Sequence, residues 1–158
     1  MNHNIKTDVF IPCSPKDFPV MQRALQYIAS NIQTVGDIHV SMPSKGLCRD
    51  FTIGGHGVYF HNDEDLVSRR YIGMCRFRPN WIYQQVLKLC QRVTKTPYYF
   101  CIDADCIPIK SIELFNEIGQ AALFSRTGVA DATAFIRSIA KFSGGELAQW
   151  TTAERGET

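Results

Sequence analysis

Residues 7–42 read TDVFIPCSPKDFPVMQRALQYIASNIQTVGDIHVSM. Residues 7–13 form a short β-branched and aromatic run that Pro12 and Pro15 end, which is typical of a buried strand leading into a loop. The following apolar residues are spaced by three and four, which predicts a helix capped by Asp17 or Ser14: Phe18, Met21, Leu25, Ile28 and Ile32. Residues 38–42 alternate again as a second strand. A strand, a helix and a strand at this spacing predict a βαβ unit with two parallel strands.

The segment 44–78 carries no sustained period, and we expect it to be irregular. Its run Gly54-Gly55-His56-Gly57 lacks the spacing of a phosphate-binding loop, which favours a plain turn. The acidic run 61–65, HNDED, precedes no clear apolar strand. A solvated loop or the start of a helix is the expected structure there, and metal binding by these acids is the alternative.

Regular structure is expected to return at Asn80. Ile82, Val86, Leu89 and Val93 share one face of a helix of ordinary length, and Lys88 lies off that face. The helix ends at Thr96-Pro97, and residues 98–102, YYFCI, are continuously apolar. Such a run predicts a central strand buried on both faces.

The rest of the chain is expected to contain two helices and then a polar end at residues 143–158. Ser111 can cap a short helix that ends before Gly119, and a second helix is expected at residues 130–141. No strand is predicted after residue 119. The sequence therefore predicts an α/β fold with its parallel strands in the first 102 residues.

Composition excludes several classes of protein. The chain has 158 residues, enough for one domain, and its 17 basic and 15 acidic side chains leave a net charge of only +2. No polycationic surface for nucleic acid is expected. Apolar runs do not approach the roughly 20 residues of a membrane helix, and the polar start does not resemble a signal peptide. The six cysteines show no CxxC pair. We expect a protein of the cytoplasm without a transmembrane segment or a structural zinc site.

Two carboxylates follow the apolar run directly, at Asp103 and Asp105. Ligands of open α/β sheets bind at the carboxyl ends of the strands, where these residues are expected. In extended backbone both side chains would point to the same side. Oxygen donors without a neighbouring histidine suit Mg²⁺ or Mn²⁺, completed by oxygens of a phosphorylated substrate. The alternative is that the pair belongs to an ordinary turn before Pro108.

The run 98–110, YYFCIDADCIPIK, resembles the DxD element of GT-A glycosyltransferases, which use nucleotide-sugars. The start DVFIPCSPKD is similar to their first strand and nucleotide-binding loop, and the helix NWIYQQVLKL resembles that of a bacterial glycosyltransferase-like group. The resemblance implies a Rossmann-like, three-layer α/β/α GT-A fold. It implies that residues 1–119 are the donor-binding part and that residues 120–158 are the shortened remainder of the same domain.

The resemblance also implies a set of site residues. Asp103 and Asp105 would bind Mn²⁺ or Mg²⁺, and the nucleotide-diphosphate sugar would be held by Cys13, Ser14, Lys88, Asp103 and Ala104. Trp81 and Gln85 would shape the sugar pocket, although packing at the helix start is the expected role of Trp81. A solvated lysine on the helix surface is the alternative for Lys88. The second partner would be a glycan or another hydroxyl acceptor. A lysine opposite the diphosphate can offset the charge of a leaving nucleoside diphosphate.

The residues after the DxD run depart from the GT-A pattern. Residues 106–158 contain no histidine and a single aspartate, Asp131, so no general base is assigned. The expected activity is sugar transfer, and the main alternative is a catalytically incomplete fragment or module that only binds the nucleotide-sugar. A phosphatase of the HAD class, with Asp103 as its nucleophile, is a further alternative. Nucleic-acid binding by Arg69, Arg70, Arg76 and Arg78 is another, although a solvated loop is the expected structure there.

Overall fold

The structure of the chain is a computed structural model. It describes residues 5–70, 78–89, 92–116 and 119–121. Contacts divide the chain into two units, Met1–Ala122 and Leu123–Thr158. The described residues all belong to the first unit. The predicted helix at 130–141 lies outside them.

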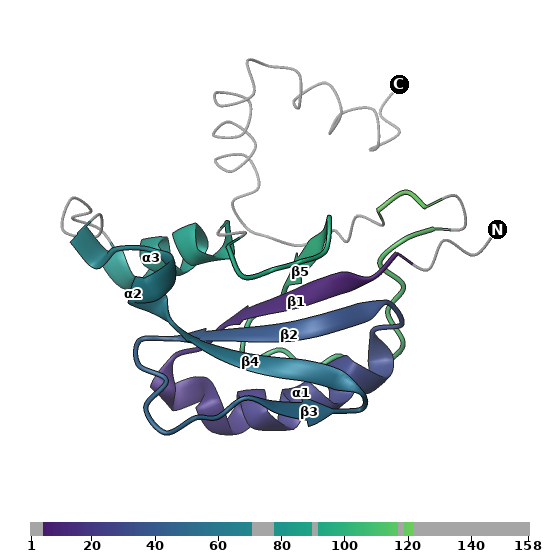
Figure 1. The fold of residues 1–158 in the computed structure, drawn as a ribbon, viewed down its shortest axis with the longest axis horizontal. Coiled ribbons are helices and arrows are strands. Elements are labelled where there is room, and N and C mark those ends of the chain that lie inside the picture. Colours follow the sequence, from purple (N-terminus) through teal and green to yellow (C-terminus); the bar gives the residue numbers. More distant parts are fainter. Residues whose placement is uncertain (1–4, 71–77, 90–91, 117–118, 122–158) are drawn as a thin grey trace, which may run out of the picture. The chain divides into compact units, whose positions relative to one another are not determined.

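The described residues form a five-stranded mixed sheet with helices, so the predicted α/β class is confirmed (Figure 1). The elements in chain order are β1 (Thr7–Pro12), the 3-10 helix η1 (Pro15–Asp17), α1 (Phe18–Asn31), β2 (Val35–Met42), β3 (Phe51–Ile53), β4 (His56–Asn62), α2 (Asp63–Leu66), α3 (Pro79–Lys88) and β5 (Tyr99–Cys101). The strand order is β3-β4-β2-β1-β5. All neighbouring pairs are parallel except β3 and β4.

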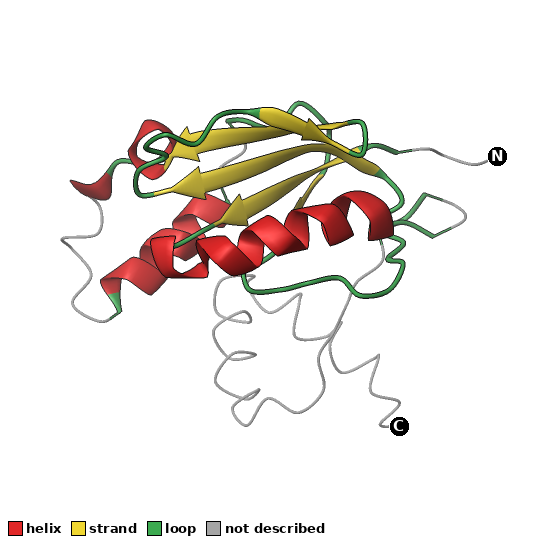
Figure 2. Ribbon diagram, turned by 90° about the horizontal axis from the view of Figure 1, so that it is seen from below, coloured by secondary structure: helices red, strands yellow, loops and turns green. Residues whose placement is uncertain are grey.

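The predicted βαβ unit is confirmed as β1, α1 and β2. Figure 2 shows α1 running along one side of the sheet. Its apolar face buries Met21, Leu25 and Ile28 against inward-facing strand residues such as Val9 and Ile11. Because each strand alternates its side chains, β1 also has a second buried face. The predicted helix cap is wrong in detail: Asp17 occupies the cap position without a side-chain cap bond, and its carboxylate instead accepts a hydrogen bond from Ser14.

The other face of the sheet carries α3. Phe10 of β1 packs there with Leu66, Tyr83 and Leu87. The predicted apolar face of this helix is therefore wrong, because Tyr83 and Leu87 are the buried residues while Leu89 is 77% exposed. The helix also ends at Lys88, earlier than predicted. This shorter helix places Lys88 at its carboxyl end, beside the edge of the sheet.

The expectation of an irregular middle segment is wrong, since β3 and β4 form an antiparallel hairpin there. The turn at Gly54-Gly55 is confirmed, and both glycines have positive φ angles of 57° and 87°. Two such residues between strands make the turn that best matches strand twist. The run HNDED ends β4 and begins α2, so its interpretation as a helix start is confirmed.

Two predictions near residue 100 need correction. The strand predicted at 98–102 spans only Tyr99–Cys101. The prediction of a central strand buried on both faces is wrong, because β5 lies at the edge of the described sheet next to β1 and its residues are half-buried. A helix beginning at Ser111 is also wrong for the described residues 111–116. Ile112 instead bridges Ile32 in parallel, and its N–H donates to the carbonyl of Asn31 at 2.7 Å.

Replacing Gly36 with alanine is expected to lower the free energy of unfolding by about 2 kcal/mol, as overpacking commonly does. A Cβ at this position of β2 would lie 2.4 Å from Oδ1 of the buried Asp8 side chain. Urea unfolding of Gly36→Ala checks this. If the contact with Asp8 is the cause, the same substitution in an Asp8→Ala background should cost less than about half as much. Equal costs in both backgrounds would contradict this explanation.

None of the helices in the described part of the chain combines the length and the apolar composition that crossing a membrane requires.

Candidate functional site

A cavity of about 460 Å³ lies at the carboxyl ends of the parallel strands, on the α3 side of the sheet. Three segments contribute most of its lining: the loop after β1, the start of α2 with Arg69, and α3. The lining residues that matter below are Cys13, Ser14, Asp63, Arg69, Trp81, Tyr83 and Gln84. Ligands of parallel α/β sheets bind at this edge, which makes the cavity the leading candidate site.

The loop after β1 brings Cys13 and Ser14 to the cavity, as predicted from the sequence. The Cys13 side chain is buried, and burial, followed by the charges of Asp17 and Asp63, raises the pKa of its thiol to about 12. A neutral, buried thiol is not a nucleophile. The contribution of this loop to a ligand is therefore mainly its backbone and the Ser14 hydroxyl, which is bound to Asp17 at 2.7 Å.

Asp63 borders the cavity although it is not among the site residues predicted from the sequence. It begins α2, as the helix-start interpretation predicts, but it is not solvated, since only 5% of it is exposed. Burial raises the pKa of its carboxyl group, while the neighbouring Ser41 hydroxyl and Arg69 partly oppose the rise. Among the described residues its Oδ1 atom has no hydrogen-bond partner. The unpaired Oδ1 atom is itself buried, so Asp63 borders the cavity as a desolvated carboxyl group whose Oδ1 is covered by protein.

A second group of charged residues lies at the same edge of the sheet. The Lys88 ammonium lies 2.6 Å from Oδ1 of Asp103, which follows β5. The structure thus brings together two residues that the resemblance assigned to one site. Lys88 extends from the turn of α3 that carries Leu87, a lining residue of the cavity.

The geometry predicted for the DxD run is partly wrong. Asp103 to Cys106 form a turn, closed by the Cys106 N–H donating to the Asp103 carbonyl at 2.9 Å. The two aspartates are therefore not in extended backbone, and the turn alternative describes their conformation. Both carboxylates are exposed at the carboxyl edge, while the side chain of Ala104 is buried in the core. Ala104 is therefore a core residue, and the ligand contact that the resemblance implied for it is not supported.

These donors fit a cation only in part. Within the described residues, no three His, Cys, Asp or Glu side chains lie together as a metal-binding group. Asp103 is already paired with Lys88, whereas Asp105 is exposed. Carboxylate oxygens suit a hard cation such as Mg²⁺ or Mn²⁺, which keeps waters and takes phosphate oxygens as its other ligands, but Asp103 would join Asp105 only by giving up part of its contact with Lys88.

Of the two residues expected to shape a sugar pocket, Trp81 lines the cavity, and the glutamine that joins it is Gln84 in place of Gln85. Arg69 also lines the cavity, with its guanidinium 5.4 Å from the centre of the Tyr83 ring. Arg78 stacks on Trp81 at 5.5 Å, and Arg76 lies outside the described residues. Two of the four arginines proposed for nucleic acid thus have aromatic partners beside the cavity.

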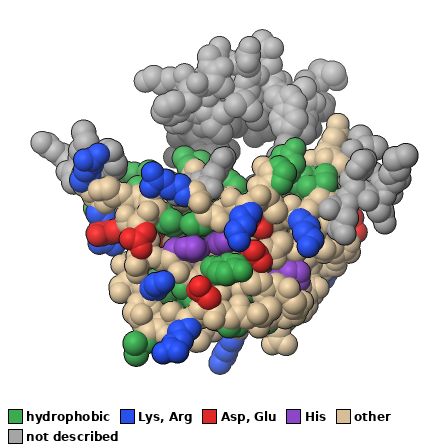
Figure 3. All heavy atoms as spheres, viewed as in Figure 1, with side chains coloured by type: hydrophobic (Ala, Val, Ile, Leu, Met, Phe, Trp, Pro, Cys, Tyr) green, Lys and Arg blue, Asp and Glu red, His purple; other side chains and the backbone are tan. Residues whose placement is uncertain are grey.

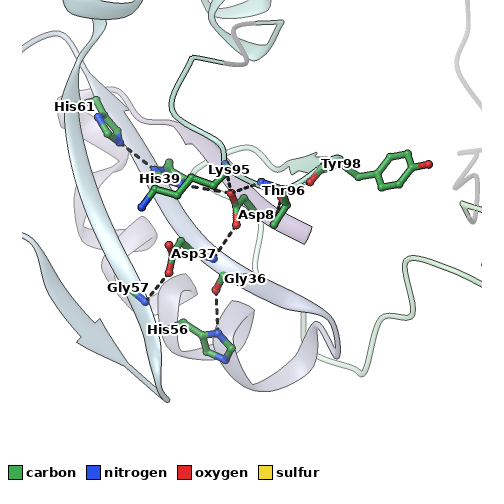
Figure 4. A network of polar contacts seen from close by, with 10 residues as sticks. All are labelled: Asp8, Gly36, Asp37, His39, His56, Gly57, His61, Lys95, Thr96 and Tyr98. Atoms are coloured by element: carbon green, nitrogen blue, oxygen red, sulfur yellow. Dashed lines mark hydrogen bonds and ion pairs between the residues drawn. The ribbon is translucent and has the colours of Figure 1, made fainter. Parts of the chain in front are cut away.

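A polar network crosses one face of the sheet, and its Asp8 end lies at the starts of β1 and β2, the edge opposite the cavity. Histidine side chains lie in the middle of the surface shown in Figure 3, with acidic and basic side chains around them. His39 of β2 and His61 of β4 lie with their Nδ1 and Nε2 atoms 3.1 Å apart, and His39 Nε2 is 3.8 Å from Oδ2 of Asp8 (Figure 4). Burial lowers the pKa of both histidines, and for His39 the neighbouring His61 lowers it further.

Acidification is expected to destabilise the fold through His39, of which only 3% is exposed. A histidine with a lowered pKa binds fewer protons when folded than when unfolded, so stability is lost as the pH falls below the unfolded value of about 6.5. Between pH 7.5 and 5.5 the loss from this residue should be about 1 kcal/mol. Urea unfolding of wild type, His39→Gln and His56→Gln at both pH values measures it. The loss should shrink in His39→Gln alone, and an equal loss in all three proteins would contradict it.

Comparisons with known protein families, with curated proteins and with solved structures found no match to this chain.

Proposed function

We propose that this protein binds a nucleotide-diphosphate sugar with a divalent cation, and that it transfers the sugar to a hydroxyl acceptor as GT-A glycosyltransferases do. One observation carries the proposal. The cavity beside the Cys13 and Ser14 loop lies at the same sheet edge as the Lys88 and Asp103 ion pair and the exposed Asp105. A nucleoside needs a cavity of this kind, and a diphosphate needs cationic partners beside it.

The nucleoside, the diphosphate and the cation each have a matching group. The nucleoside would occupy the cavity, where the half-exposed Trp81 offers aromatic surface. The diphosphate would lie toward Lys88, which can exchange part of its contact with Asp103 for a phosphate oxygen. Asp105, together with Asp103, would hold Mn²⁺ or Mg²⁺.

The chemistry follows from this placement. In sugar transfer the acceptor oxygen bonds to the anomeric carbon, the bond from that carbon to the phosphate oxygen breaks, and the acceptor proton passes to a base. When bound, the cation offsets negative charge on the leaving diphosphate. Lys88 provides a second, fixed positive charge at the same place, and its effect is greatest when the leaving group carries most charge.

Thermal unfolding tests the binding part of the proposal. UDP, GDP, ADP and CDP are each added with and without MnCl₂. At a concentration about 100 times the dissociation constant, a bound nucleotide should raise the midpoint by about 5 °C or more. At least one diphosphate should do so, and more strongly with Mn²⁺. If none of the four changes the midpoint under either condition, the donor site is wrong.

A protein that binds the donor without transferring it is the second candidate. It is favoured by residues 106–158, which contain no histidine and only Asp131 as an aspartate. UDP-sugars and GDP-sugars incubated with the protein and MnCl₂ separate the two candidates. Release of free nucleoside diphosphate, with the sugar passed to water or to an added sugar acceptor, supports transfer. Binding without any release supports the second candidate.

A further inference from the structure

The loop that leads into β5 is held by one buried carboxylate. Asp8, of which 2% is exposed, accepts hydrogen bonds from the backbone N–H groups of Lys95 at 2.7 Å and Thr96 at 3.3 Å. The Asp8 N–H in turn donates to the Thr96 hydroxyl at 2.9 Å. Its other oxygen accepts from the Asp37 N–H at 2.9 Å. Asp8 therefore joins the starts of β1 and β2 to the loop at residues 95 and 96 (Figure 4).

This loop is connected to the candidate site by short contacts. It runs directly into β5, where Tyr99 pairs with Asp8 in the sheet. The Tyr99 hydroxyl donates to the backbone carbonyl of Lys88 at 2.8 Å, and the Cys101 thiol donates to the same carbonyl at 3.3 Å. Lys88 then pairs with Asp103, which follows β5. A shift of the loop along β5 would therefore move both members of that ion pair.

Only one arrangement of the ring protons on the two neutral histidines is favourable beside the Asp8 carboxylate. If His39 Nδ1 donated to His61, the lone pair of His39 Nε2 would face the Asp8 carboxylate across 3.8 Å. If His61 Nε2 donates to His39 Nδ1, the His39 Nε2–H points toward that carboxylate instead. His39 Nε2 has no hydrogen-bond partner among the described residues, so in the second arrangement its N–H group points at Asp8.

We propose that Asp8, His39 and His61 are positioning residues for the donor site, and that protonation of the histidine pair loosens the grip of Asp8 on the loop at Lys95 and Thr96. The consequence for donor affinity rests on the function proposed above. The loosening itself does not, because it concerns contacts within the sheet face and the loop.

A proton added to the pair has two effects in the same direction. The positive charge draws Asp8 Oδ2 toward His39, away from the Lys95 and Thr96 N–H groups that it now accepts from. The same charge repels Lys95, whose ammonium lies 5.7 Å from the centre of the Tyr59 ring. Tyr59 stacks on His39 with ring centres 5.4 Å apart, so this cation lies on the histidine side of the loop. Both effects displace the loop.

The remaining charged groups around the pair come from the strands and loops beside it. Asp8 and Asp37 favour the protonated form of His39, while His61 and Lys95 oppose it. Asp50 and Asp65 favour protonation of His61, and Lys45 opposes it. Burial opposes both protonations, which places the transition on the acid side of an ordinary histidine.

Backbone amide NMR of the intact chain tests the loosening between pH 7.5 and 5.0. The Lys95 and Thr96 amides should shift together with the histidine ring signals, and their exchange with solvent, corrected for intrinsic pH dependence, should become about tenfold faster or more. In His39→Gln both changes should disappear. His61→Gln, at a less buried position, provides a second variant if His39→Gln folds poorly. His56→Gln is the matched control, because His56 bonds the Gly36 carbonyl, on the peptide group whose N–H binds the other Asp8 oxygen, and among the described residues it makes no hydrogen bond with His39, Lys95 or Thr96.

The affinity for UDP or GDP with MnCl₂, measured in the same proteins, tests the link to the site. It should fall roughly fivefold or more between pH 7.5 and 5.5 in wild type, relative to His39→Gln or His61→Gln at the same pH values. Amides that do not respond to histidine titration, or a His56→Gln variant that behaves like His39→Gln, would overturn the inference. A loop that responds while neither nucleotide binds would refute the proposed function and leave the loosening established. If the loop responds to pH but the affinity for UDP or GDP, relative to the histidine variants, does not change, the positioning role is refuted.

Discussion

Replacing Asp8 with asparagine is expected to lower the free energy of unfolding by about 3 kcal/mol, which is the largest stability effect expected for a single polar side chain here. The carboxylate accepts three backbone N–H groups, from Asp37, Lys95 and Thr96. An asparagine side chain has the same shape, but one of its two terminal groups is an N–H₂ donor. The backbone N–H groups that face this group lose their acceptor and are left unpaired. Each buried donor left without a partner costs about 1 to 3 kcal/mol. Urea unfolding at pH 7.5 measures the change.

Asp50→Asn is the matched control for this substitution. Asp50 also accepts a backbone N–H, from Phe60 at 2.8 Å, but it is exposed and accepts only that bond among those described. Its replacement should cost about 1 kcal/mol or less. Equal costs at the two positions would show that Asp8 does not hold the loop.

The pKa of Asp8 gives the same contact a pH dependence. Burial alone would raise the pKa, but the three backbone donors and the His39 charge outweigh it and lower the pKa. Because the pKa is lower in the folded state, Asp8 stabilises the fold above its unfolded pKa of about 3.9, and this stability is lost as the pH falls below that value. Below about pH 4, the free energy of unfolding of Asp8→Asn should therefore fall less steeply with pH than that of wild type.

Replacing Asp105 with alanine is expected to weaken the binding of UDP or GDP in MnCl₂ by about 100-fold, the largest expected effect on ligand binding. Asp105 is an exposed carboxylate at the carboxyl edge of the sheet, and Asp103 already shares its charge with Lys88. Removing Asp105 leaves the cation without its freest protein ligand. Calorimetric titration measures the affinity.

Two comparisons make this result specific. Glu113→Ala, an exposed acidic residue further along the chain, should bind as wild type does. With the metal removed by EDTA, wild type and Asp105→Ala should bind equally weakly. If Asp105→Ala keeps the wild-type affinity in MnCl₂, the metal site is elsewhere or absent.

The strongest periodicity in the sequence predicted the fold best. In α1 the residues Met21, Leu25 and Ile28 repeat at helical spacing, and they are buried as that spacing requires. The hairpin was missed because β4 has only Val58 and Phe60 as buried apolar positions, and histidine and tyrosine alternate with them. Two buried apolar positions give an alternation too short to predict a half-buried strand.

The site was predictable only where its residues followed a recognisable run. Cys13 and Ser14 follow the first strand, and Asp103 and Asp105 follow the last, so their placement at one sheet edge was expected from the parallel topology. Asp63 was not, because its burial depends on β4, which was not predicted. The network at Asp8 was also missed. Its partners are as many as 88 positions away in the chain, at Thr96, and their contact depends on the three-dimensional pairing of β1 with β5.

Calorimetric titration of the intact protein with UDP and GDP, each with and without MnCl₂, tests the central claim most directly. Saturable binding of one nucleotide per chain is expected for at least one of the two, and much weaker binding when the metal is left out. The absence of binding for both nucleotides in the presence of MnCl₂, by a protein that remains folded, would contradict it.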